Sequence, residues 1–79
     1  MVGAQNLGIF RLSETLIEEH PELVMRLMGR AIILSAKPAL LEREIEYLAL
    51  SPEFEEVSDD ATIPVYGVKT VGLDIVFTI

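Results

Sequence analysis

The segment IPVYGVKTVGLDIVFTI, residues 63–79, contains the clearest fold signal in this sequence. Apolar residues alternate with other residues in both of its halves, which is typical of strands with one buried face. Gly72 separates the halves and is a turn signal, so we predict a β-hairpin that pairs residues 63–71 with residues 73–79. Pro64 places the first strand at an edge or near a strand end, because proline cannot donate a backbone hydrogen bond.

Three segments upstream of the hairpin also indicate strands. Residues 30–37 form a short apolar run rich in β-branched side chains, and Pro38 then ends it. A short edge strand is expected over residues 8–12. The apolar spacing within residues 38–51 fits a helix as well as a strand, but the residue types favour a strand over 43–50. That strand would place three side chains on one face: Ile45, Tyr47 and Ala49.

Residues 13–29 show the pattern of an amphipathic helix. Apolar side chains recur at steps of three and four residues, with acidic residues early and arginines late, which suits the helix dipole. Pro21 interrupts this pattern because it lacks a backbone N–H group and its ring clashes with the preceding turn. Either the helix kinks near His20, or a second helix begins with Pro21 as its first residue. The apolar stripe keeps its phase across Pro21, so we predict one kinked helix over residues 13–29.

These elements predict an α+β fold in a single domain, residues 1–79, with one amphipathic helix packed on a small antiparallel sheet of three to four strands. A chain this short has a small core, yet 51% of its residues are hydrophobic. Some apolar side chains are therefore expected on a surface that a partner covers. A homo-oligomer, with a dimer favoured, would provide that cover. Scattered exposed leucines on a monomer are the plainer alternative.

The acidic residues are concentrated in residues 42–60, which account for the whole net charge of −7. Binding to nucleic acid requires clustered Lys and Arg, so we expect no nucleic-acid partner, and anionic membranes are disfavoured for the same reason. No apolar stretch reaches the length of a membrane span, and the sequence contains no cysteine. We therefore expect a cytoplasmic protein. The natural complement of the acidic segment is a basic surface on another protein.

The residues expected to contact such a partner combine carboxylates with one aromatic side chain. Glu44 and Glu46 share one face if their segment forms a strand, and this row either meets basic residues of a partner or serves as a solvated polar face. Tyr66 is expected at the surface, whereas Tyr47 and Phe54 are expected in the core. The predicted partner-binding residues are Glu44, Glu46, Glu53, Glu55, Glu56, Asp59, Asp60 and Tyr66.

The last predicted strand offers an oligomer interface as an exposed edge that pairs with a second copy, or else it forms an internal strand of the monomer sheet. The interface residues would be Leu73, Ile75, Phe77 and Ile79. No catalytic residue is predicted, because the single histidine, His20, has no nucleophile partner. No metal site or cofactor is predicted either. The spacing of a calcium loop is missing from the nearest carboxylates, which are Glu55, Glu56, Asp59 and Asp60.

From Tyr47 onward the sequence contains a Tyr-x-Ala-x-Ser-Pro-x-Phe stretch, an acidic turn and a Pro-x-Tyr strand. These positions are Tyr47, Ala49, Ser51, Pro52, Phe54, Pro64 and Tyr66. The pattern resembles small phage-encoded accessory proteins. That resemblance implies the cytosol of a bacterial host and a mode of action in which the protein binds and blocks a host protein, sometimes one of a defence system. It implies no catalytic residues.

We therefore expect a non-enzymatic binding protein that blocks a host protein by occupying a basic surface. The acidic segment would set the rate of approach and the choice of partner, and it could also imitate nucleic-acid phosphates in a basic groove. The alternative is a self-assembling structural or assembly protein whose apolar surface is a homo-oligomer interface. A metal-dependent enzyme is the third hypothesis.

Overall fold

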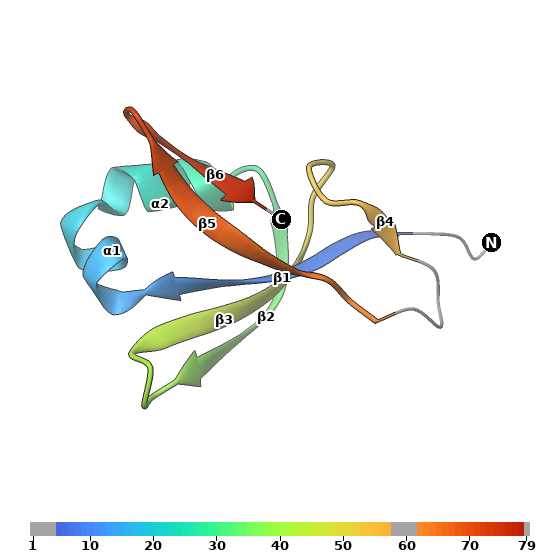
Figure 1. The fold of residues 1–79 in the computed structure, drawn as a ribbon, viewed down its shortest axis with the longest axis horizontal. Coiled ribbons are helices and arrows are strands. Elements are labelled where there is room, and N and C mark those ends of the chain that lie inside the picture. The colour runs from blue at the N-terminus through green and yellow to red at the C-terminus, as the bar shows by residue number, and fades with distance from the viewer. Residues whose placement is uncertain (1–4, 58–61, 79) are drawn as a thin grey trace.

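The computed structural model describes residues 5–57 and 62–78 of the chain. Within these residues strands dominate, and the helices are short (Figure 1). The expectation of one helix on a sheet of three to four strands is therefore wrong. The elements in chain order are β1 (Gln5–Ser13), α1 (Glu14–Glu19), α2 (Pro21–Met28), β2 (Ile32–Ala39), β3 (Glu44–Leu50), β4 (Glu56–Val57), β5 (Val65–Val71) and β6 (Asp74–Thr78).

The strands form one mixed sheet in the order β2-β3-β1-β5-β6, and β4 pairs with the start of β1 outside this order. Neighbouring strands are antiparallel except β1 and β5, which run parallel where Ile9 lies opposite Val65 and Phe10 opposite Tyr66. A purely antiparallel sheet was expected, and this parallel pair overturns it. The β2–β3 hairpin lies on one side of β1, and the β5–β6 hairpin lies on the other side together with the helices (Figure 1).

β1 lies in the middle of the sheet, so the short edge strand expected over residues 8–12 is wrong in both length and position. Phe10 and Leu12 are buried on one face of β1. Gly8 lies in β1 and allows two aromatic rings to pack closely against the strand. A Cβ atom at Gly8 would lie 2.8 Å from ring atoms of both Phe54 and Tyr66.

The helical region is divided into two helices, not one kinked helix. Ser13 caps α1, since its Oγ accepts a hydrogen bond from the Leu16 N–H at 3.0 Å. His20 leaves the helical conformation, with φ −132°, and Pro21 is the first residue of α2. The prediction of one helix over 13–29 fails because Pro21 has no N–H group to continue the ladder of hydrogen bonds. The second alternative, a new helix beginning at Pro21, is the one observed.

The remaining strand predictions are confirmed, with one difference. β3 forms at the predicted place, and the C-terminal hairpin forms as β5 and β6 with Gly72, at φ +59°, in its turn. β2 continues through Pro38, which lies opposite Ile45, instead of ending before it. Proline is tolerated there because β2 is an edge strand, where one row of N–H groups needs no partner in the sheet.

The hydrophobic core lies on one face of the sheet, which we call the inner face. It combines buried residues of the sheet with Val24 and Leu27 of α2 and with Phe54 from the β3–β4 connection. The rings of Phe54 and Tyr66 stack with centroids 4.6 Å apart. Burial raises the pKa of Tyr47 above its ordinary value of 10.0. The buried residues from the strands are Phe10, Leu12, Ala49, Tyr66 and Ile75.

Candidate functional site

The opposite face of β2, β3, β1 and the start of β5 carries a row of aliphatic side chains. Residues that are direct partners on neighbouring strands share a face. In the register of the sheet Leu7 and Ile32 both lie opposite Leu50, while Leu48 and Val65 both lie opposite Ile9. We call this the outer face. Its apolar patch consists of Leu7, Ile9, Ile32, Leu48, Leu50 and Val65.

The apolar patch is separate from the hydrophobic core. None of its six residues belongs to the buried core cluster or to the half-buried apolar side chains that pack against that cluster. Ile32 and Val65 are each 66% exposed, and the other four are half-buried. The solvent face of a sheet with one buried face usually carries polar residues. A patch of aliphatic side chains at this place is therefore a candidate interaction surface.

A row of charged side chains borders the apolar patch on the same face. Arg11 lies opposite Glu46, and Lys37 lies opposite Glu46 from the other side. Arg11 donates to Glu46 Oε1 from Nε at 3.1 Å and from Nη2 at 3.0 Å. Weaker ion pairs join Arg11 Nη1 to Glu44 Oε1 at 3.8 Å and Lys37 Nζ to Glu46 Oε2 at 4.0 Å. Two cations and two carboxylates give this row a formal charge of zero.

The sequence correctly placed Glu44 and Glu46 together on a face pointing away from the core. Leu48 and Leu50 continue the same row, which the sequence analysis did not identify because Ile45, Tyr47 and Ala49 already form an apolar face on the other side of the strand. The signal was present as four consecutive apolar residues, Tyr47 to Leu50, in a strand with one face already assigned to the core. The pairing of the two glutamates with Arg11 and Lys37 had no local sequence signal.

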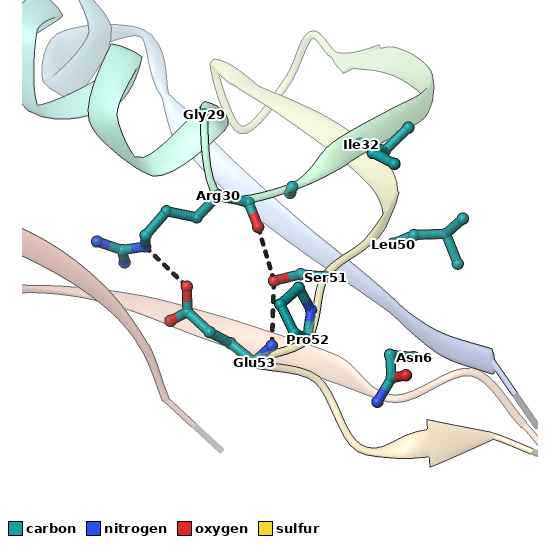
Figure 2. Close-up of a pocket in the computed structure, with 9 residues that line it drawn as sticks. Asn6, Gly29, Arg30, Ile32, Leu50, Ser51, Pro52 and Glu53 are labelled. Carbon is teal, nitrogen blue, oxygen red and sulfur yellow. Dashed lines mark hydrogen bonds and ion pairs between the residues drawn. The ribbon is translucent and has the colours of Figure 1, made fainter.

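A groove of about 720 Å³ opens at the β2–β3 end of the apolar patch. Ile32 and Leu50 of the patch line it together with Ala31 and Pro52, so its wall is mainly apolar. Figure 2 shows that the side chains of Ile32 and Leu50 lie on one side of this region, while the side chain of Arg30 points to the opposite side. The groove thus extends the apolar surface beyond the flat part of the sheet.

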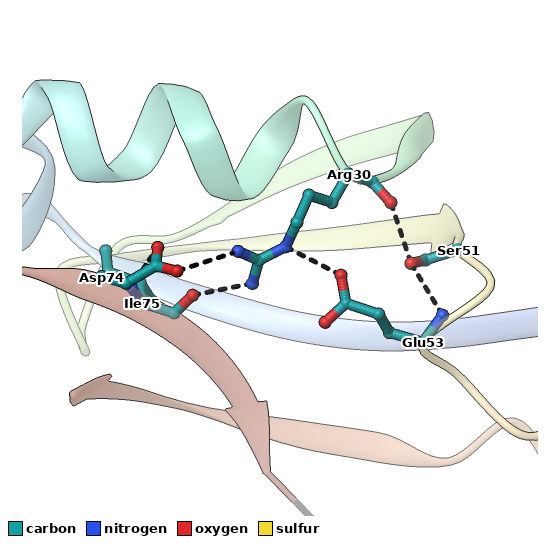
Figure 3. A network of polar contacts seen from close by, with 5 residues as sticks. All are labelled: Arg30, Ser51, Glu53, Asp74 and Ile75. Carbon is teal, nitrogen blue, oxygen red and sulfur yellow. Dashed lines mark hydrogen bonds and ion pairs between the residues drawn. The ribbon is translucent and has the colours of Figure 1, made fainter.

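Arg30 fixes the position of the wall of this groove by joining three segments (Figure 3). Its Nη2 donates to the Ile75 carbonyl at 2.7 Å, and its Nη1 lies 3.5 Å from Asp74 Oδ2. Its Nε lies 2.7 Å from Glu53 Oε2. The carboxylate is off the N–H direction, so Nε is paired by charge without a hydrogen bond. Sequence reasoning counted Arg30 among the late basic residues of the helix and as the start of the strand over 30–37, and it could not find these partners because they are distant in the chain.

The other predicted partner-binding residues are divided among different environments. Glu53 is held by Arg30, whereas Glu55 and Glu56 are exposed and make no ion pair with any cation among residues 5–57 and 62–78. Tyr66 is only 5% exposed, and its Oη accepts a hydrogen bond from the Glu55 N–H at 2.9 Å. The expected surface position of Tyr66 is therefore wrong. Asp59 and Asp60 lie outside the described residues.

The predicted oligomer interface on the last strand is not a continuous exposed surface. Ile75 is fully buried, and Phe77 is half-buried against Phe10 and Phe54. Leu73 is exposed in the turn before β6, and Ile79 lies outside the described residues. β6 is the last strand in the order of the described sheet, so the alternative of an internal strand is not observed. The pairing of this edge with a second copy stays a prediction. Alternation in the sequence identified a common face, but that face is the inner one.

His20 lies exposed at the junction of the two helices, beside a hollow of about 390 Å³ that is also lined by Glu19, Glu22 and Arg26. Among the residues that the structure describes, no three His, Cys, Asp or Glu side chains gather closely enough to hold a metal ion. No helix in the same part of the chain is long and apolar enough to cross a membrane.

Comparisons with models of protein families, with curated proteins and with solved structures found no match. A functional proposal for this chain therefore rests on the geometry of its surfaces. On the outer face, as far as residues 5–57 and 62–78 form it, apolar side chains and paired charges lie together.

Proposed function

We propose that this chain is a non-enzymatic protein-binding protein and that the outer face of its sheet is the contact surface. The observation that carries the proposal is the apolar patch, because six aliphatic side chains share a sheet face and, among residues 5–57 and 62–78, none of them belongs to the core cluster. Protein interfaces commonly have an apolar centre and a polar rim. The patch, bordered by Arg11, Lys37, Glu44 and Glu46, has that composition. We also propose a cytosolic location, with which the absence of cysteine agrees.

The physical argument is the cost of leaving this patch in water. Burying apolar surface contributes about 25 cal/mol per Å², and aliphatic side chains on a pleated surface can be covered by a flat partner without rearrangement. The ion pairs at the border already hold the Arg11 and Glu46 side chains in place. A partner therefore meets ordered side chains, which reduces the entropy lost on binding.

Photo-crosslinking tests the proposal at exposed positions, where a bulky residue does not disturb packing. Ile32 or Val65 on the patch is replaced by benzoylphenylalanine, and the protein is illuminated inside the cells that produce it. The matched controls are Met25 on α2 and Leu73 in the β5–β6 turn, which are 73% and 86% exposed. We expect discrete protein adducts from the two patch positions and not from the controls. Equal adduct patterns at all four positions, or none at the patch, would exclude the outer face as the contact surface.

A second candidate function is the blocking of a basic surface on a host protein by the acidic segment. Exposed Glu55 and Glu56, with no ion pair among the described residues, favour this candidate, whereas Glu44, Glu46 and Glu53 are paired with cations of the chain itself. The resemblance to phage-encoded proteins stays part of this second proposal. A crosslinking residue at position 55, compared with one at exposed Glu19, distinguishes it, since only position 55 should then give an adduct.

A further inference from the structure

We infer that the occupant of the outer face is a second copy of this chain. The two copies are related by a two-fold axis that is parallel to the strands and lies above the outer face, midway between β1 and β3. The inference rests on the proposed function of the outer face as a contact surface, and it names the partner. Its starting point is a self-complementary arrangement of side chains on two neighbouring strands. Two-fold dimers are the commonest oligomers, and each copy contributes the same patch to such an interface.

Charge is the first argument for a second copy. The chain carries a net charge of −7, so two copies repel each other over most orientations. The charged row of the outer face is an exception, because Arg11 and Lys37 balance Glu44 and Glu46. Two copies can therefore approach through this face without bringing unbalanced carboxylates together.

The register of β1 and β3 supplies the second argument. A two-fold axis along the strands places β3 of one copy over β1 of the other. Leu48 then faces Ile9 of the second copy, and Leu50 faces its Leu7, because these residues are direct cross-strand partners within one copy. The same operation places Glu46 over Arg11 of the second copy, so these three pairs are aliphatic with aliphatic or acid with base, and Glu44 faces the polar side chain of Ser13. Two sheets stacked in this way lie about 10 Å apart, the usual spacing of a sandwich.

The edges of the sheet are less suited to a second copy than its face. Arg26 Nη1 donates to the Leu73 carbonyl at 3.2 Å in the turn before β6, and Arg30 Nη2 donates to the Ile75 carbonyl of β6, so arginine side chains occupy part of this edge. On β2, the register shifts between Ile33 and Ser35, and Pro38 offers no N–H group. A bulge and a proline are features that oppose edge-to-edge pairing.

A charge exchange between two variants tests this arrangement on the full chain. In Arg11→Glu both positions of the facing pair are acidic, and in Glu46→Arg both are basic, so each variant alone meets its own copy with like charges. We expect each to lose about tenfold or more in dimer affinity. An equimolar mixture should recover dimers, because each glutamate then faces an arginine of the other chain. Sedimentation velocity gives the masses, and circular dichroism with thermal melting verifies that both variants are folded.

A second pair of variants keeps the test decisive if a charge variant does not fold. Leu48→Thr removes apolar contact at the centre of the patch while keeping a good strand former, and it should lower dimer affinity. Leu34→Thr changes an equally aliphatic residue, 50% exposed at the β2 bulge and outside the patch, and should leave affinity unchanged.

The possible results separate this inference from the proposed function. Wild-type chain that stays monomeric at all concentrations, or dimers that are insensitive to both Arg11→Glu and Leu48→Thr, would overturn the second copy as occupant. If illumination of the Ile32 and Val65 positions yields adducts only with other proteins, the inference fails and the proposed function stands. If these positions yield no specific adduct, both fail.

Discussion

Ser51 joins three segments of the chain through its hydroxyl and its backbone. Its Oγ donates to the Arg30 carbonyl at 2.9 Å and accepts from the Glu53 N–H at 3.2 Å. Its own N–H donates to the Asn6 carbonyl at 2.9 Å. Ser51 is only 2% exposed. We predict that Ser51→Ala lowers the free energy of unfolding by about 1–3 kcal/mol, because two backbone groups lose their partner.

Urea denaturation measures this loss, and Ser35→Ala is the matched control. Ser35 is exposed on β2, and a surface substitution of this kind changes stability by about 0.5 kcal/mol or less. Similar denaturation midpoints for Ser51→Ala and Ser35→Ala would show that the Ser51 hydroxyl does not hold the corner between α2 and β2. The position of the groove wall beside Ile32 would then depend on contacts other than the hydrogen bonds of Ser51.

At the scale of elements, β1 depends on the small size of Gly8. Alanine there would bring its Cβ within 2.8 Å of Phe54 and Tyr66, whose stacked rings form part of the core. We predict that Gly8→Ala destabilises the fold by about 1–3 kcal/mol, since core overpacking forces rings off their positions. Gly29→Ala is the control, because its nearest neighbours would be 3.4 and 3.5 Å away and its φ of −68° suits any residue. Thermal melting should separate the two variants, and equal melting temperatures would contradict the prediction.

The elements that the sequence predicted best are those formed by neighbours in the chain. The C-terminal hairpin and β3 follow from alternation over a few residues, and Gly72 supplies the turn between β5 and β6. The length of β1 and its central position were not predicted, because no local pattern shows that Gly8 packs against the rings of Phe54 and Tyr66. The apolar stripe continues across Pro21 and therefore favours one helix, although the chain forms two. Periodicity reports which side chains share a face and not whether the backbone bonds continue.

At the scale of the whole molecule, the sequence could place side chains on a face but could not say which face the core would occupy. Glu44 and Glu46 were correctly directed outward, whereas Tyr66 and Ile75 were expected in contacts at the surface and are buried. The difference lies in the strand order. The pairing of β1 with β5 directs Tyr66 toward Phe10 and the core, and no local pattern specifies a pairing between such distant segments.

The position of the first strand between β3 and β5 has a consequence for the rate at which the chain folds. The two hairpins join near neighbours, but Ile9 meets Val65 only after nearly the whole chain has come together. Closing so long a loop costs entropy before any contact repays it, so we predict refolding on a scale of about milliseconds to seconds. Stopped-flow circular dichroism measures this rate without tryptophan, which the sequence lacks. Relaxation within microseconds would contradict it.

Before β5 pairs with β1, one side of β1 has unpaired backbone groups that strands of other molecules can bind. The yield of folded protein should therefore fall as the protein concentration during refolding rises.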